Sequence, residues 1–284
     1  MTSTTSTARD QTMIGGKSQQ GGQGETLRAG VQLLINGVRH VWLLVLLLLL
    51  WQLIVSLKLY PAFLLPSPVA VLKSLIGTAE SGYLTNNIMV SLNRQMIGFV
   101  LSVAFALPVG IFLGYSPRFR QPMLPILQLL YPIPGLAWVP LAILWLGIGN
   151  APIIFVIFFS SIWPLLFNTQ AGIANINPIY RRAAMALGTS PLRTFTRVII
   201  PAALPFIVAG LRLTYGTSWR VIVGAEILSS HSGLGFMIDN ARGLLRGDEV
   251  IAGMITIAVL GYLFEKIAFD ILEHYTIKKW GMSL

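Results

Sequence analysis

Ionisable side chains are rare in the long apolar runs of this chain, and those that occur there are the first candidates for chemistry. Arg212, Trp219 and Glu226 recur every seven residues, which places them along one face of a helix. Arg220 lies slightly to the side of this face, and Arg94 interrupts an earlier apolar run. A charge at mid-membrane costs about 2.5–3.5 kcal/mol on insertion scales, so it faces a bundle interior or a water-filled path. Arg94, Trp219, Arg220 and Glu226 are therefore candidate residues of a translocation path.

A structural interpretation of the same residues stays open. Arg212 could extend its guanidinium to the membrane surface, while Glu226 pairs with Arg94 or Arg220 and holds helices together. Where these arginines do line a path, their positive charge favours an anionic solute.

The sequence contains no pattern typical of an enzyme or a metal site. We find no HExxH, no GxSxG and no pair of carboxylates at helical spacing, so we expect no catalytic residue. The three histidines are scattered without ligand spacing, so no metal site is expected. Gly16-Lys17-Ser18 is similar to the end of a phosphate-binding loop, but Gln11 stands where that motif needs glycine. We therefore expect no nucleotide and no cofactor in this chain.

The composition is that of a membrane protein. Hydrophobic residues make up 55% of the 284 residues and charged residues 11%, whereas soluble domains carry about a quarter charged residues. The fold class predicted is all-α, a polytopic membrane protein. The net charge of +10 lies in short loops beside apolar runs, which is typical of membrane topology, so no nucleic-acid partner is expected.

Hydropathy divides the chain into a polar leader and six transmembrane helices. Residues 1–30 are rich in Ser, Thr, Gln and Gly and are predicted to be a disordered cytoplasmic leader, and residues 31–284 form the membrane domain. A short amphipathic helix is expected at Val69–Thr78, after a loop with three prolines, and a turn at Pro117–Arg120. The six expected spans are Val38–Leu57, Asn87–Tyr115, Pro122–Leu146, Pro152–Ala171, Ala202–Leu228 and Val250–Leu272. Between the last two spans we expect a polar loop rich in Gly and Ser.

Basic residues predict the orientation. With a cytoplasmic N-terminus, twelve of the Lys and Arg residues fall in inside segments and only Lys58, Lys73, Arg242 and Arg246 fall outside. Both termini are therefore expected in the cytoplasm, and the localisation expected is the inner (plasma) membrane.

The third span contains the cluster Tyr131-Pro132-Ile133-Pro134-Gly135, which should break or kink it near its middle. Prolines and glycines are tolerated in a span where neighbouring helices or a water-filled path satisfy the freed backbone groups. Pro134 is accordingly a further candidate for the path, and a purely structural kink is the alternative.

The stretch 180–205, YRRAAMALGTSPLRTFTRVIIPAALP, is basic and lies between two apolar runs. A short helix over Ala183–Leu187, ended by Gly188, would present a small, smooth face to which another protein can dock. The alternative is a basic loop whose arginines reflect only the enrichment of positive charge on the cytoplasmic side of membrane proteins.

This stretch resembles the cytoplasmic coupling loop of ABC-importer permeases, whose form is Glu-Ala-Ala, three residues, Gly, nine residues, Ile-x-Leu-Pro. Ala183, Ala184, Gly188 and Pro201 match in register, and Arg182 stands where the family usually has Glu. The segments YPIPGLAWVPLAILWLGIGNAP, FLLPSP and SGLGFMIDNAR are similar to the nitrate/sulfonate/taurine/bicarbonate branch, and the resemblance covers residues 60–280.

The resemblance implies a six-helix type I permease with a cytoplasmic coupling helix in a loop at 175–201. Its ATPase-coupling residues would be Arg182, Ala183, Ala184, Leu187, Gly188 and Pro201. The partners implied are a second copy of the chain, two cytoplasmic ATPase subunits or domains that hold ATP and Mg, an extracytoplasmic substrate-binding protein, and membrane lipid.

The function expected is that of a permease for a small anionic solute such as nitrate, bicarbonate, a sulfonate or taurine. The alternative is an ion-driven secondary carrier or a channel. Such carriers usually show inverted repeats and midplane acids, whereas we find no convincing repeat and place only Glu226 well inside a span.

Overall fold

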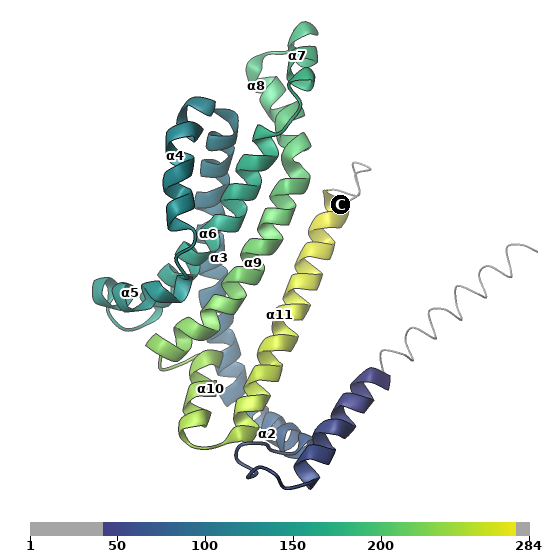
Figure 1. Ribbon diagram of the computed structural model, residues 1–284, viewed down its shortest axis with the longest axis vertical. Helices are drawn as coiled ribbons and strands as arrows, with labels where there is room; N and C mark the ends of the chain where they lie inside the picture. The colour runs from purple at the N-terminus through teal and green to yellow at the C-terminus, as the bar shows by residue number, and fades with distance from the viewer. Residues whose placement is uncertain (1–41, 277–284) are drawn as a thin grey trace, which may run out of the picture. The chain divides into compact units, whose positions relative to one another are not determined.

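The computed structural model describes residues 42–276, and every regular element in this range is helical (Figure 1). Contacts divide the chain into two compact units, one ending at Ala62 and one beginning at Phe63. The described part of the first unit contains the apolar helix Trp42–Ser56. The predicted leader, the beginning of the first span and Lys278 and Lys279 lie outside the described residues.

The second unit begins with α2 (Pro68–Glu80), close to the amphipathic helix that the sequence predicts. Ser67 caps it, since its side chain accepts a hydrogen bond from the Ala70 N–H (3.2 Å), and Pro68 occupies the first helical turn. Gly82, in the left-handed region at φ +74°, reverses the chain into α3 (Tyr83–Tyr115), which ends at the residue that the sequence predicts.

A row of small residues on α3 brings it close to α6 (Asn150–Ala174). The row repeats every four residues, which is one face of a helix, and all its members are buried: Gly98, Ser102, Ala106, Gly110 and Gly114. A Cβ at Gly110 would lie 2.8 Å from the Leu166 carbonyl oxygen. Small residues are what allow helix backbones to approach in membranes, so this row defines the α3–α6 packing.

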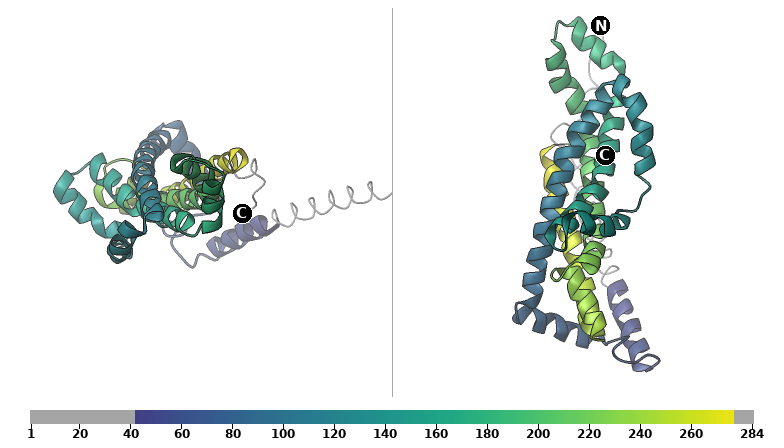
Figure 2. Two further views of the ribbon diagram at one scale, coloured as in Figure 1. Left: turned by 90° about the horizontal axis from the view of Figure 1, so that it is seen from above. Right: turned by 90° about the vertical axis from the view of Figure 1, so that its left-hand side faces the viewer.

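Helix α6 is the centre of the bundle. It packs most extensively against α3 and α9 (Ile200–Ser229), and Figure 2 gives two further views of these long helices. Its side chains supply much of the main apolar cluster, including Ile162, Trp163, Leu165 and Leu166. Because α6 lies in the interior of the bundle, neighbouring helices can satisfy the backbone groups that Pro164 leaves free.

The third predicted span is broken, as its proline cluster predicts. Helix α4 (Pro117–Leu130) and the pair η1 (Gly135–Trp138) and α5 (Val139–Leu146) meet at 84°. The expected turn at Pro117–Arg120 is wrong, because Pro117 instead occupies the first turn of α4, where its missing N–H costs nothing.

The rest of the chain forms α7 (Pro178–Ala186), α8 (Pro191–Thr194), η2 (Phe195–Ile199), α9, α10 (Leu234–Gly243) and α11 (Gly247–Tyr275). The loop expected between the fifth and sixth spans is wrong in part, since it contains α10. Among residues 42–276 four helices are long and apolar enough to cross a membrane, or five if the bent pair is one span. A multi-span, all-helical fold is thus established. The count of six spans stays a prediction, because the described part of the first predicted span is the short helix Trp42–Ser56.

Candidate functional site: a helical hairpin at one end and a buried charge network toward the other

The stretch that matches the coupling pattern forms α7 and α8, which lie at the end of the second unit away from α2 and α10 (Figure 1). Asn177 begins α7, since its side chain accepts from the Ile179 N–H (2.9 Å), and Pro178 occupies the first turn. The helix thus begins five residues before the predicted Ala183, and its last residue is Ala186.

Gly188 ends α7 in the way that the sequence predicts. Its φ of +75° lies in the left-handed region. The Gly188 N–H donates to the Met185 carbonyl (3.0 Å) and the Thr189 N–H to the Ala184 carbonyl (3.2 Å), the paired bonds of a Schellman motif. Gly188 thereby turns the chain toward Ser190, which caps α8.

Nearly all of α7 is exposed, although several of its side chains are apolar. Leu187 is 84% exposed and Leu192 on α8 is 72% exposed, and the other exposed apolar side chains are Ile179, Tyr180 and Met185. Ala184 is the buried residue of the helix, whereas Arg182 and Ala183 face outward. This apolar surface, flanked by arginines at the tip of the hairpin, has the character of a protein interface.

Pro201 explains the irregular turn that connects the hairpin to the bundle. Residues 191–229 form one continuous helix, so Pro201 is an interior proline with no N–H to donate and a ring that crowds the carbonyl four residues back. The helix widens into the π turn η2 at this point, where the Ile200 N–H bonds to the Phe195 carbonyl.

Two of the candidate path residues, Arg94 and Glu226, form a buried ion pair instead of lying apart. Arg94 Nη1 is 2.9 Å from Glu226 Oε1, and their side chains are 5% and 0% exposed. The Ser91 hydroxyl lies 2.8 and 2.9 Å from the two carboxylate oxygens and donates to the carboxylate. The guanidinium also donates to Asn150 on α6 (2.8 Å) and to the Ser232 carbonyl (2.7 Å). Each charge is therefore paired and hydrogen-bonded, which is what burial requires.

The same network holds the N-terminus of α10. The N–H groups of Gly233, Leu234 and Gly235 donate to Asn87 (2.7 Å), Ser91 (2.8 Å) and Glu226 (2.9 Å) respectively. A carboxylate at the positive end of a helix is stabilising. Gly233 has φ +105°, and a Cβ there would overlap the Glu226 carboxylate. The network thus explains why glycine is needed at Gly233 in the SGLGF segment. It also contains the pairing of Glu226 with Arg94 that the structural interpretation named.

The other candidates lie elsewhere on the bundle. Trp219 is buried and donates from Nε1 to the Ile257 carbonyl (3.2 Å) on α11. Arg220 is exposed and lines a groove of about 290 Å³ between α9 and α11. Pro134 is exposed at the break that precedes η1. The structure therefore brings Arg94 and Glu226 together, places Trp219 and Arg220 along one groove, and leaves Pro134 apart.

The sequence analysis missed one charged residue on the wall of this groove. Glu265 lies within the apolar span of α11, although only Glu226 was placed inside a span. Its carboxylate is 3.9 Å from Arg212 Nε, and the Arg212 guanidinium also lies over the Phe269 ring at 5.5 Å. Its position fifteen residues into the sixth predicted span is the signal that could have found it.

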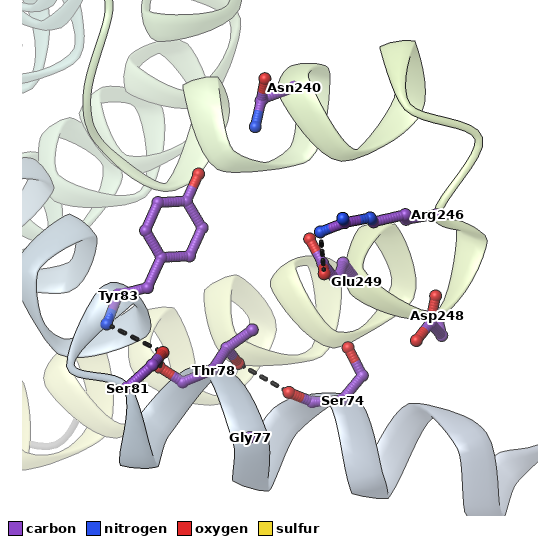
Figure 3. Close-up of a pocket in the computed structure, with 9 residues that line it drawn as sticks. All are labelled: Ser74, Gly77, Thr78, Ser81, Tyr83, Asn240, Arg246, Asp248 and Glu249. Atoms are coloured by element: carbon purple, nitrogen blue, oxygen red, sulfur yellow. Dashed lines mark hydrogen bonds and ion pairs between the residues drawn. The ribbon is translucent and has the colours of Figure 1, made fainter.

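The end of the second unit opposite α7 carries a polar cleft of about 490 Å³ (Figure 3). Ser74 and Thr78 of α2 form one wall, and Asn240, Arg246, Asp248 and Glu249 form the other, with Tyr83 at one end. Arg246 donates to Glu249 (3.0 Å) across one helical turn. Hydroxyl, amide, guanidinium and carboxylate groups line this cleft, whereas the hairpin exposes mainly large apolar side chains and arginines.

Comparisons with known proteins identify the fold and the family of the chain. The chain is similar in structure to the MetNI methionine ABC transporter in its inward-facing conformations, with a TM-score of 0.60 over 68% of this chain and 96% of that chain at 18% identity. The chain matches the binding-protein-dependent transport system inner membrane component over residues 106–279, and it belongs to that family.

Curated relatives extend over most of the chain. The taurine transport system permease protein TauC of Escherichia coli is 37% identical over 78% of this chain and 82% of its own length. The putative aliphatic sulfonates permease SsuC of Bacillus subtilis is 35% identical over 82% and 84%. The nitrate import permease NrtB of Synechocystis is 34% identical over 82% and 87%. The chain is accordingly a multi-pass inner-membrane permease, the non-catalytic subunit of a binding-protein-dependent ABC importer, and its partners include an ATPase and a binding protein.

Proposed function

We propose that two copies of this chain form the path by which a small anion enters the cell. We further propose that the ATPase binds α7 and thereby drives the conformational change of the two copies. The observation that carries this proposal is the exposed apolar surface of the hairpin, above all Leu187, at the tip of a helix that continues into the bundle. An exposed apolar patch with a polar rim marks an interaction site, and the arginines beside this patch favour a protein partner in the cytoplasm.

The residues proposed to couple to the ATPase are Arg182, Ala183, Ala184, Leu187, Gly188 and Pro201. Arg182 and Leu187 would contact the ATPase, and the small side chain of Ala183 would allow the ATPase to approach the α7 backbone closely. Gly188 and Pro201 would fix the two ends of the segment that transmits the motion. Gly188 ends α7, and Pro201 determines the π turn before α9. Arg182 replaces the family's usual acid, so we expect its salt bridge to run to a carboxylate of the ATPase.

The partners follow from the two ends of the second unit. Two ATPase subunits would bind the two hairpins from the cytoplasm and hold ATP and Mg, so this chain needs no cofactor. The binding protein would dock at the polar cleft of α2, α10 and α11 on the outer face. Cytoplasmic termini and six spans, with Trp42–Ser56 as part of the first and the bent α4–α5 pair as the third, are the topology proposed.

The path would lie where the two copies meet. Trp219 and Arg220 line an open groove on α9, and a cation at this depth faces water or protein rather than lipid. Pro134 would shape the path at the break, and Arg94 and Glu226 would set the position of α10 beside it. The relatives are named for taurine, aliphatic sulfonates and nitrate, each of which bears an anionic oxygen group, and this agrees with the exposed guanidinium of Arg220 in the groove.

Substitution of Gly188 tests the proposal. Gly188→Val places a β-branched residue at φ +75°, which costs about 1–2 kcal/mol. It should alter the end of α7 while the complex still assembles. We expect ATP-driven uptake to fall by about tenfold while ATP hydrolysis continues, as measured in vesicles that contain the assembled transporter.

Gly188→Asn is the matched control, because asparagine tolerates the left-handed region. It should retain at least half of the wild-type uptake. A Gly188→Val transporter with wild-type uptake would contradict the coupling role of α7.

A further inference from the structure

We infer that the groove between α9 and α11 binds the oxyanion group of the transported solute through Arg220 and Tyr215. This inference rests on the proposed function and adds a contact site to it. The groove is lined by Gly216, Trp219 and these two residues from α9 and by Ile257, Ala258, Gly261, Tyr262 and Glu265 from α11.

Arg220 supplies a positive charge that nothing on its own chain compensates. Its side chain is exposed, and it has no hydrogen-bond or ion-pair partner among residues 42–276. The guanidinium turns back over Gly216, where its Nη2 lies 4.0 Å from the position that a Cβ would take. Gly216 thus leaves room for the guanidinium inside the groove.

Tyr215, which lines the same groove, supplies a second donor. The residue is 5% exposed, and within the described part of the chain its buried hydroxyl has no hydrogen-bond partner. The ring is held by Phe99, Trp219 and Phe269, with ring centroids 5.7 to 6.4 Å away. A buried hydroxyl without a partner is costly, so a ligand that accepts a hydrogen bond here would be stabilised.

The position of Arg220 within the apolar helix argues against a lipid headgroup as the ligand. Arg220 precedes Ser229, the last residue of α9, by nine residues, or about 14 Å of helix, and it lies inside the stretch that is long and apolar enough to cross a membrane. Lipid phosphates lie at the surface of the hydrocarbon layer. An anion that crosses the membrane is the ligand that reaches this depth.

The charges in the groove favour an oxyanion over a cation. Glu265 is the acid on the facing wall, and its carboxylate lies 3.9 Å from Arg212, which offsets its charge. The Trp219 N–H already donates to Ile257. The donors that remain are the planar Arg220 guanidinium and the hydroxyls of Tyr215 and Tyr262, and a guanidinium with hydroxyl donors matches nitrate, bicarbonate or a sulfonate group.

The test measures ATP-driven uptake of labelled nitrate, bicarbonate and taurine into vesicles that contain the permease, its ATPase and its binding protein. Tyr215→Phe removes one oxygen atom and keeps the ring packing, and Arg220→Gln removes the charge. Arg118→Gln and Tyr60→Phe make the same changes at exposed positions outside the groove.

We expect the maximal uptake rate of the transported anion to fall about 5- to 10-fold in Tyr215→Phe and about 10- to 100-fold in Arg220→Gln, the range for lost hydrogen bonds to a charged group. KM should stay within about twofold, because the binding protein captures the solute. Assembly and ATP hydrolysis should persist, and both controls should transport at the wild-type rate.

Wild-type uptake in Tyr215→Phe and Arg220→Gln would overturn the inference. Dissociation of the two copies in Arg220→Gln, seen by native mass spectrometry, would also overturn it, since Arg220 would then pair with the second copy. If the wild-type assembly takes up none of the three anions, the proposed function itself fails, and the site fails with it.

Discussion

At the scale of single residues, the pair Arg94–Glu226 connects four helices. Arg94 and Ser91 come from α3, Glu226 from α9 and Asn150 from α6, and the carboxylate accepts from the first turn of α10. A buried pair of this kind is weak support for stability by itself, but removing one partner leaves an uncompensated buried charge.

Arg94→Met should therefore destabilise the permease by about 3–5 kcal/mol, because Glu226 would remain charged and buried. The measurement is thermal unfolding of the detergent-purified chain. The double variant Arg94→Met with Glu226→Gln should recover part of the loss, because it removes both charges.

Asp239→Asn is the matched control, since Asp239 and Arg242 form an exposed pair at 2.7 Å. It should change the stability by at most about 1 kcal/mol. Additive losses in the Arg94 and Glu226 double variant would contradict the pairing as the cause.

The sequence could identify these residues but not their relation. Arg94 and Glu226 are 132 positions apart, and their types and depth in the apolar runs mark them as interior. Which arginine pairs with Glu226 depends on how α3, α9 and α10 pack, which no local pattern encodes. From the sequence, Arg220 could be placed only on one face of its own helix. The groove around it could not be predicted, because Glu265 and Tyr262 come from another helix.

At the scale of elements, the row of small residues on α3 sets the distance to α6. Gly110→Ala should destabilise the chain by about 1–3 kcal/mol, because its Cβ would lie 2.8 Å from the Leu166 carbonyl oxygen, and a backbone atom yields only if the helix moves. Thermal unfolding measures this loss.

Gly77→Ala on α2 is the control. A Cβ at Gly77 has no neighbour within 4 Å, so alanine should stabilise the helix by about 0.5–1 kcal/mol. Equal effects of the two substitutions would show that helix propensity, and not close packing of α3 on α6, determines the result.

Helix ends were predictable where a local rule applies. Tyr115 and Gly188 were placed correctly, since a proline follows Ser116 and glycine favours the left-handed turn. The proline cluster predicted the break after α4. The sequence analysis missed α10, because Ser and Gly read as a loop while its N-terminus is held by side chains of α3 and α9.

At the scale of the whole molecule, the proposed function assigns a partner to two exposed surfaces of the described residues. We propose that an ATPase covers the apolar tip of α7 and that the groove of α9 faces a second copy. Native mass spectrometry of the complex purified in mild detergent should therefore show two copies of this chain with two ATPase subunits. A stable complex with one copy would contradict the proposed path.

We propose that α7 lies in the cytoplasm and binds the ATPase. The chain has no cysteine, so Leu187→Cys gives a single thiol at a position of the hairpin that is 84% exposed, and Gly243→Cys at the end of α10 is the control for the opposite face.

A membrane-impermeant maleimide should label Gly243→Cys in intact cells, while Leu187→Cys should react only after the cells are opened. A bifunctional thiol reagent should then cross-link Leu187→Cys to the ATPase. Labelling of Leu187→Cys from outside intact cells, or the absence of a cross-link to the ATPase in the assembled complex, would contradict a cytoplasmic, ATPase-bound α7.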